Sequence, residues 1–264
     1  MTTPPELSAL IPSQPAPPAL HADDIHVRWV MPEIFHDLPL HEPDDDEAVR
    51  LVEELVERAL PGAGEDDRTR FGLICALSVD DLRAAGTEYA AVCLTAVNDS
   101  FCSATMFASL VDSPDVDGVW GAVKAISSSL RGIEAGEISE LELPCGLGVS
   151  CVGTRQETLP DGLTEHGEKL GFPTASIRVY VPLPNGTTVV MEMSTPTMTG
   201  WDTFSTMFGN TVSSIRLFNA DGSRLITCGT GEWRAQGLRP PTTGSSYPVT
   251  GSGSTPRRSA GAAS

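Results

Sequence analysis

Carboxylates and histidines are the side chains of this chain that could carry out chemistry, and they gather at a few places. Glu140 and Glu142 stand two residues apart, a spacing that puts both on one face of a strand and could serve acid–base catalysis. His166 lies beside Glu165 and Glu168 in a polar segment. The chain holds 35 acidic residues against 17 basic ones, so a solvated acidic surface explains these groups better than a catalytic pair.

Metal ligation could be assigned to four early histidines, His21, His26, His36 and His41. The segment from His21 to His26 combines imidazoles with carboxylates, which suit a transition metal. Metal ligands need a second shell to hold them, however, and this segment follows a proline-rich approach. We therefore interpret it as a polar loop and expect no metal.

The six cysteines do not have the spacing of a zinc site. Cys145 and Cys151 are separated by five residues, and Cys93 and Cys102 by eight. In a reducing cytoplasm we expect reduced thiols, and we interpret Cys93 and Cys102 as small core residues. No Gly-x-Ser-x-Gly nucleophile elbow and no glycine-rich phosphate loop opens a helix. The sequence thus predicts a protein that is not an enzyme and holds no cofactor.

Net charge narrows the classes of partner. A formal charge of -18 repels phosphate backbones and anionic membrane surfaces. The last acidic residue is Glu232, so the remainder of the chain is basic. We find no signal-peptide pattern and no apolar run of about 18 residues. These features predict a cytoplasmic protein with neither nucleic-acid nor membrane partners.

The elements that position these side chains follow from hydrophobic periodicity. The acidic run 44–47 begins a helix that Pro61 ends, and residues 65–67 begin a second helix whose apolar stripe is Phe71, Ile74, Leu77 and Leu82. These two helices predict an N-terminal helical hairpin. Further predicted elements are strands at 88–97, 101–111, 141–143 and 149–158, with a helix at 117–130.

The most informative segment runs from Ile177 to Leu217. A three-residue loop at 184–186 would pair Val179 with Met191 on one face and Arg178 with Glu192 on the other. Pro182 cannot donate to a ladder, so we expect a free strand edge near it that could accept a partner strand. Tyr180 would lie beside Arg178, within reach of a partner. Arg178, Tyr180 and Glu192 are thus the candidate protein-binding residues.

The segment after this hairpin predicts a helix with a buried aromatic stripe. Thr199 and Asp202 have the spacing of a capping box, and Phe204 and Phe208 follow at helical spacing. Trp120 and Trp201 each stand near the start of a helix. We interpret both as core anchors, with a ligand-pocket wall as the alternative.

Three segments of the chain resemble a known group of proteins. They are the Val-Tyr-Val-Pro-Leu-Pro-Asn-Gly hairpin at 179–186, the strand 191–196 and the helix from Trp201 to Phe208. This part of the chain resembles uncharacterised actinobacterial proteins of a Mog1/PsbP-like type. The resemblance implies an α+β fold whose members are mostly non-catalytic and act through surfaces that dock other proteins. It transfers no functional residue to this chain.

These observations predict an α+β fold, a mostly antiparallel sheet with helices packed on it. We expect a single domain over 21–233, between a disordered proline-rich lead at 1–20 and a disordered basic tail at 234–264. Hairpin–helix units at 87–132 and 172–218 could be a duplication. The predicted function is a cytoplasmic protein-binding module, such as an adaptor, chaperone or accessory factor. The alternative is a small-molecule carrier or sensor with a pocket between sheet and helices.

Overall fold

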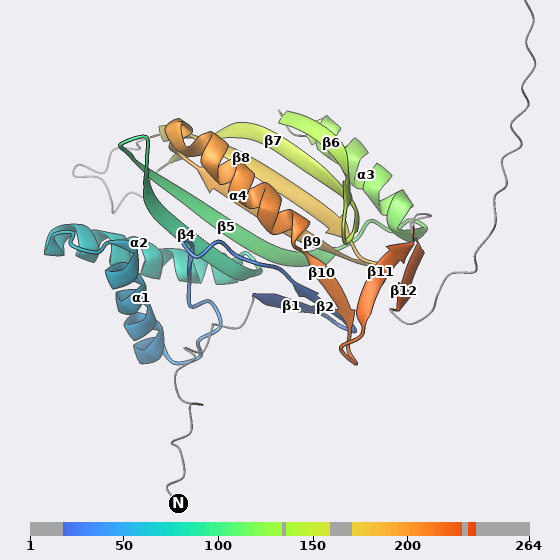
Figure 1. Cartoon of the computed structure of the whole chain (residues 1–264), viewed down its shortest axis with the longest axis horizontal. Helices are drawn as coiled ribbons and strands as arrows, with labels where there is room; N and C mark the ends of the chain where they lie inside the picture. The colour runs from blue at the N-terminus through green and yellow to red at the C-terminus, as the bar shows by residue number, and fades with distance from the viewer. Residues whose placement is uncertain (1–17, 134–135, 159–170, 229–231, 236–264) are drawn as a thin grey trace, which may run out of the picture.

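The computed structural model describes residues 18–133, 136–158, 171–228 and 232–235 (Figure 1). Within these ranges the chain forms two antiparallel sheets and four α-helices. The predicted α+β class with a mostly antiparallel sheet is confirmed. The predicted lead and tail fall outside the described residues, except that β1 begins at Ala19 and β12 runs to Ala235.

The larger sheet has seven strands in the order β3-β4-β5-β9-β8-β7-β6. Its two central hairpins, β4–β5 and β8–β9, meet along β5 and β9. In chain order the strands are β3 (His36–Asp37), β4 (Thr87–Val97), β5 (Ser100–Asp112), β6 (Gly136–Leu143), β7 (Gly146–Thr158), β8 (Gly171–Pro182) and β9 (Thr187–Thr195). Every neighbouring pair is antiparallel.

The smaller sheet joins the first described strands to the last ones. Its order is β1-β2-β10-β11-β12, again antiparallel throughout. The strands are β1 (Ala19–Ala22), β2 (Ile25–Arg28), β10 (Arg216–Asn219), β11 (Arg224–Cys228) and β12 (Glu232–Ala235). Leu20 in β1 is fully buried, so the packed structure includes residues before His21.

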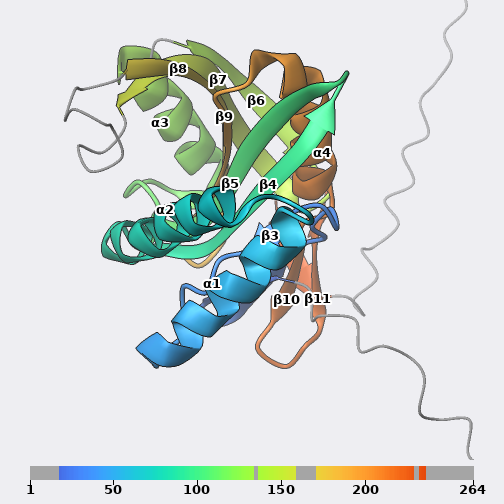
Figure 2. The same cartoon turned by 90° about the vertical axis from the view of Figure 1, so that its left-hand side faces the viewer.

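Four helices lie on opposite faces of the seven-stranded sheet. In Figure 2, α2 and α3 lie to the left of the sheet and α4 to its right. The bounds are α1 (Asp45–Ala59), α2 (Glu65–Ala84), α3 (Gly118–Ile133) and α4 (Trp201–Ser213). Both predicted hairpin–helix units occur, as β4–β5–α3 and β8–β9–α4, with their helices on opposite faces. Their origin by duplication stays a prediction.

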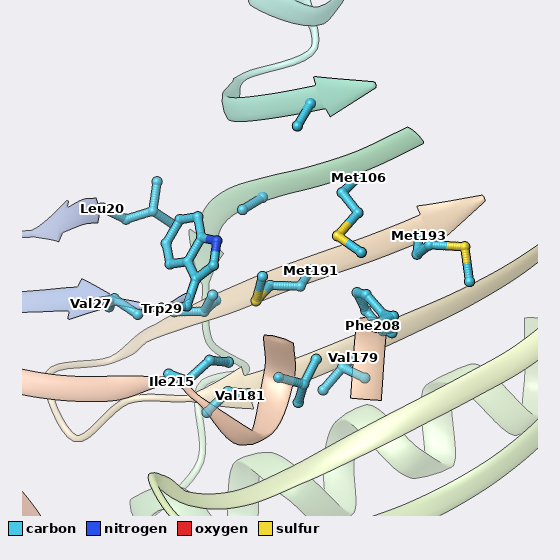
Figure 3. Packing of buried hydrophobic residues seen from close by; sticks show 14 of the residues in the cluster. Leu20, Val27, Trp29, Met106, Val179, Val181, Met191, Met193, Phe208 and Ile215 are labelled. Carbon is cyan, nitrogen blue, oxygen red and sulfur yellow. The ribbon is translucent and has the colours of Figure 1, made fainter. Parts of the chain in front are cut away.

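The main core fills the space between the two sheets and α4 (Figure 3). Trp29 follows β2 and packs edge-on against Tyr89 of β4, with 5.2 Å between ring centroids. Phe204 and Phe208 of α4 are fully buried against the methionines of β9, Met191 and Met193. One apolar cluster therefore spans the first strands, the sheet and the last helix.

The register of the β8–β9 hairpin is confirmed. Val179 pairs with Met191, and Arg178 pairs with Glu192. Gly186 adopts a φ of 86°, the left-handed conformation that the three-residue loop requires. Asn185 then donates its side-chain amide to the Ala22 carbonyl at 2.8 Å, which ties the loop to the β1–β2 turn.

The predicted capping box at the start of α4 is wrong. The helix is preceded by a short 3₁₀ turn at Met198–Gly200, and no side chain caps its first turn. Gly200 occupies the N-cap position because the ring of Phe204 lies against it. A Cβ at Gly200 would be only 2.5 Å from Phe204 Cε2. The close approach of this ring therefore decides how the helix begins.

The two predicted N-terminal helices exist and meet where Val56 approaches Gly72, and their arrangement as a hairpin stays a prediction. Figure 1 shows α1 and α2 at a steep angle to each other. The predicted stripe of α2 is only partly right, because Ile74 and Leu77 are exposed while Cys75 and Val79 are buried. Apolar residues surround α2, so their spacing did not define a single buried face.

Candidate functional site

A strip of the seven-stranded sheet lies between α2 and α3 and is formed by β5, β9 and β8. Helix α2 packs on β4 at one side of it, and α3 packs on β6 and β7 at the other. The strip's side chains are aligned by strand register, which places Phe107, Glu192 and Arg178 in one row. We call this surface the open strip and define it by Thr105, Phe107, Arg178, Tyr180, Val190 and Glu192.

Charged groups form a continuous chain along the open strip. Arg178 Nε donates to Glu192 Oε2 at 2.7 Å, and Arg155 Nη1 donates to Glu192 Oε1 at 2.6 Å. Arg155 Nε also donates to Glu157 at 2.5 Å, and Arg178 Nη1 donates to the Tyr180 hydroxyl at 3.2 Å. One carboxylate therefore holds two guanidinium groups and, through Arg178, orients a phenol.

Burial makes this chain of charged side chains different from an ordinary surface ion pair. The side chain of Glu192 is 13% exposed and that of Arg178 is 26% exposed. Burial alone would lower the pKa of Arg178, yet the Tyr180 hydrogen bond and the Glu192 charge outweigh it and raise the pKa. Burial likewise opposes the charge of Arg155, but Glu192 and Glu157 raise its pKa. Both arginines stay charged, so the strip presents fixed charges.

Two hollows border the open strip. On the α2 side a hollow of about 230 Å³ is lined by apolar groups including Phe71, Phe107 and Val92. On the α3 side a hollow of about 390 Å³ is lined by Tyr180, Thr188, Leu130 and neighbouring residues. The strip thus lies between two recesses, which Phe107 and Tyr180 also line, and this arrangement can receive side chains of a bound molecule.

The structure brings the three predicted binding residues, Arg178, Tyr180 and Glu192, together on one surface. The free strand edge expected near Pro182 is limited to the end of β8, because β8 lies between β7 and β9 and its ladder with β7 ends at Tyr180. Pro182 is tolerated there because the last pair between β7 and β8 is Val149 with Tyr180, before the proline. From Ala175 to Tyr180, where it pairs with both neighbours, β8 therefore has no free edge for strand addition.

Arg155 and Glu157 belong to the same charged chain but were not predicted from the sequence. They stand two residues apart on β7, a spacing that shows they share a face. The sequence does not tell which strand lies beside β7. The register of β7 against β8 places Arg155 opposite Thr174, and its side chain reaches Glu192 from there.

The other candidate chemical groups are engaged elsewhere. Glu140 pairs with Lys124 of α3 at 2.7 Å, and Glu142 is exposed on β6. His21 and His26 lie edge to face across the β1–β2 hairpin. Within the described ranges no three His, Cys, Asp or Glu side chains are placed to hold a metal ion. His166 and its neighbouring carboxylates lie outside the described residues.

The interpretation of Cys93 and Cys102 as core residues is confirmed. Cys75, Cys93, Cys102, Cys145 and Cys151 are free thiols and buried. Burial raises the pKa of Cys75 to about 12 and that of Cys145 to about 11. Such thiols stay protonated at neutral pH and are poor nucleophiles.

The tryptophan interpretation is wrong for Trp120. Its side chain is 57% exposed on α3, where Lys124 Nζ lies 4.4 Å from the ring centroid. Trp201 is half-buried and packs against the main core, as predicted. Neither residue lines the hollows beside the open strip.

Comparisons with protein families, with curated proteins and with solved structures find no match to this chain. No helix in the described ranges combines the length and apolar character needed to cross a bilayer.

Proposed function

We propose that the protein is a non-catalytic cytoplasmic protein-binding module, an adaptor, chaperone or accessory factor, whose partner contacts the open strip. The observation that carries this proposal is the half-buried Arg178–Glu192 pair between α2 and α3. On the reverse side of the same strands, α4 covers Val179, Met191 and Met193. The face of these strands that lies between α2 and α3 is therefore their accessible side.

The chemistry of the strip favours recognition over catalysis. Its charges are satisfied by one another at 2.6–2.7 Å, and the described residues place no metal-binding cluster there. Fixed charges with recesses on both sides suit a partner that brings complementary polar groups and apolar side chains. The Mog1/PsbP-like resemblance of the β8–β9–α4 segment points the same way.

The test is retention of a partner by the immobilised full-length protein from lysate of its own source organism. Arg178→Gln removes the charge from the open strip, and Arg216→Gln is the matched control, because Arg216 bonds only backbone carbonyls among its described contacts. We expect the wild type and the control to retain one stoichiometric protein that Arg178→Gln loses. Equal retention by all three folded proteins, or no retained protein, would contradict the proposal.

A second candidate function is that of a small-molecule carrier or sensor. It is favoured by the hollow of about 390 Å³ between α3 and the sheet, where Tyr180 and Thr188 offer hydroxyls beside Leu130. Native mass spectrometry of the purified protein would detect a bound molecule. Ser129→Trp would fill this hollow, so a retained molecule should disappear in that variant and persist in Arg216→Gln.

A further inference from the structure

A third recess lies between α1 and α2, away from the open strip. It has a volume of about 620 Å³ and is lined on α2 by Arg68, Gly72, Leu73 and Ala76. The α2 residues that face the sheet, such as Phe71 and Cys75, are a different set. We call this recess the helix groove and define it by Val49, Val52, Glu53, Val56, Glu57, Glu65, Arg68, Thr69, Gly72, Leu73 and Ala76.

The floor of the helix groove is aliphatic and open to solvent. The side chains of Val49 and Leu73 are 56% and 51% exposed. Val52 and Val56 lie deeper, where α1 approaches α2 at Gly72. Exposed aliphatic side chains that continue a buried cluster form a contiguous apolar surface, and such surfaces mark binding sites.

The rim of the helix groove is acidic. Glu53, Glu57 and Glu65 line it, and none of them is within ion-pair distance of a cation in the described part of the chain. The segment from Asp44 to Ala84 holds twelve acidic and five basic residues. The local field is therefore strongly negative around an apolar floor.

The arginine that lines the groove, Arg68, donates its Nε to the Ala63 carbonyl at 3.0 Å and forms no ion pair with the rim carboxylates among the described residues. Arg50 binds Glu47 and Glu54 on its own helix. Arg83 donates to the carbonyls of Leu40, Pro39 and Glu42 instead of turning to the groove. A cation supplied by another molecule would thus meet unpaired carboxylates.

We propose that the helix groove binds a basic amphipathic helix of a partner protein. Apolar side chains at helical spacing would lie on Val49, Val52 and Leu73, with Lys or Arg beside the rim carboxylates. The lining residues span 49–57 of α1 and 65–76 of α2, a length that suits about three turns of a partner helix. A second copy of this chain is disfavoured, because its net charge of -18 would meet an acidic rim.

This inference concerns a surface separate from the open strip, so the two can fail independently. If both hold, the protein has two docking surfaces, as an adaptor needs. The Arg178→Gln experiment leaves the helix groove intact, and a change at Leu73 leaves the open strip intact.

The test uses the full chain and a labelled model peptide of about 18 residues, with Leu at helical spacing and Lys elsewhere. Two comparison peptides have Glu in place of Lys, or the same Leu and Lys in scrambled order. Fluorescence anisotropy gives the Kd of each. Leu73→Arg places a cation in the groove, and Ile133→Arg is the control at an exposed site on α3.

We expect the Leu–Lys peptide to bind the wild type and Ile133→Arg equally, and Leu73→Arg about tenfold or more weakly, because like charges meet on a desolvated floor. Equal affinity for Leu73→Arg would overturn the proposal. So would equal binding of the scrambled peptide, which would show general attraction to an acidic protein, or no binding at all. Tighter peptide binding by an Arg257→Glu, Arg258→Glu variant would assign the groove to the chain's own basic segment and overturn the partner assignment.

Discussion

Arg178 and Glu192 lie directly opposite each other in the β8–β9 register. Their side chains meet at 2.7 Å on the face of the sheet that carries α2 and α3. Cross-strand pairs of opposite charge stabilise an antiparallel ladder. This pair is also partly withdrawn from water, with Glu192 13% exposed. Its carboxylate is therefore a structural requirement as well as a surface feature.

Glu192→Gln should lower the free energy of unfolding by roughly 1–3 kcal/mol, because Arg178 and Arg155 would lose their shared counter-charge in a half-buried site. Glu140→Gln is the matched control, since Glu140 pairs with the more exposed Lys124. That change should cost less than about 1 kcal/mol. Urea unfolding of both variants measures the difference, and equal losses would contradict this account of Glu192.

The Arg178–Glu192 pair could be predicted because the information is local. The alternation of residues 177–182 and 187–193 and the loop between them determine one register. Whether the strand edge at Pro182 is free could not be predicted from the local sequence. Its neighbour β7 is separated from β8 in the sequence, and nothing in the local pattern of β8 states that β7 lies beside it. Arg155 was missed for the same reason.

Gly200→Ala and Gly209→Ala should change stability in opposite directions. A Cβ at Gly200 would lie 2.5 Å from the buried ring of Phe204 and 3.2 Å from Cys102 Cβ, so overpacking should cost about 1–3 kcal/mol. Gly209 lies inside α4, and a Cβ there would have no described neighbour within 4 Å, so alanine should stabilise by up to about 1 kcal/mol. Thermal unfolding of the two variants measures both changes in stability. A stabilised Gly200→Ala variant would show that Phe204 can move.

The start of α4 and the buried face of α2 show where sequence patterns were insufficient. Thr199 and Asp202 fit a capping box, but tertiary packing of Phe204 on Gly200 determined the actual start. In α2, Leu73, Ile74 and Leu77 are as apolar as the buried Cys75 and Val79. Which residues are covered depends on the angle between α1 and α2, and that angle follows from contacts that periodicity does not describe.

Stability should fall as the pH rises above about 9, because buried thiols resist ionisation. Burial raises the pKa of Cys75 from 9.0 to about 12 and the pKa values of Cys93 and Cys145 to about 11. In the unfolded chain these thiols ionise near pH 9, whereas the folded chain keeps them protonated. Their contribution is present below about pH 9 and is lost between about pH 9 and 12.

The measurement for this pH effect is urea unfolding at about pH 8 and about pH 10 under reducing conditions. Cys75→Ala should reduce the dependence on pH, because its thiol pKa is raised further than those of Cys93 and Cys145. Tyr89 adds to the same trend, since burial and the nearby Asp37 raise the pKa of its phenol. A stability that stays constant across this pH range would refute the assignment of these thiols to a dry core.

Replacing Trp29 and Trp120 by alanine should have very different effects. Trp29 is almost fully buried and meets Tyr89 edge to face, so its removal should cost about 3–5 kcal/mol. Trp120 is 57% exposed and contacts Lys124 through its ring, an interaction worth about 0.5–1 kcal/mol at such a site. Urea unfolding followed by circular dichroism compares the two without relying on tryptophan emission. A loss above about 2 kcal/mol for Trp120→Ala would restore the interpretation of that residue as a core anchor. Acrylamide quenching of tryptophan fluorescence that declines in the same variant would confirm that Trp120 is exposed.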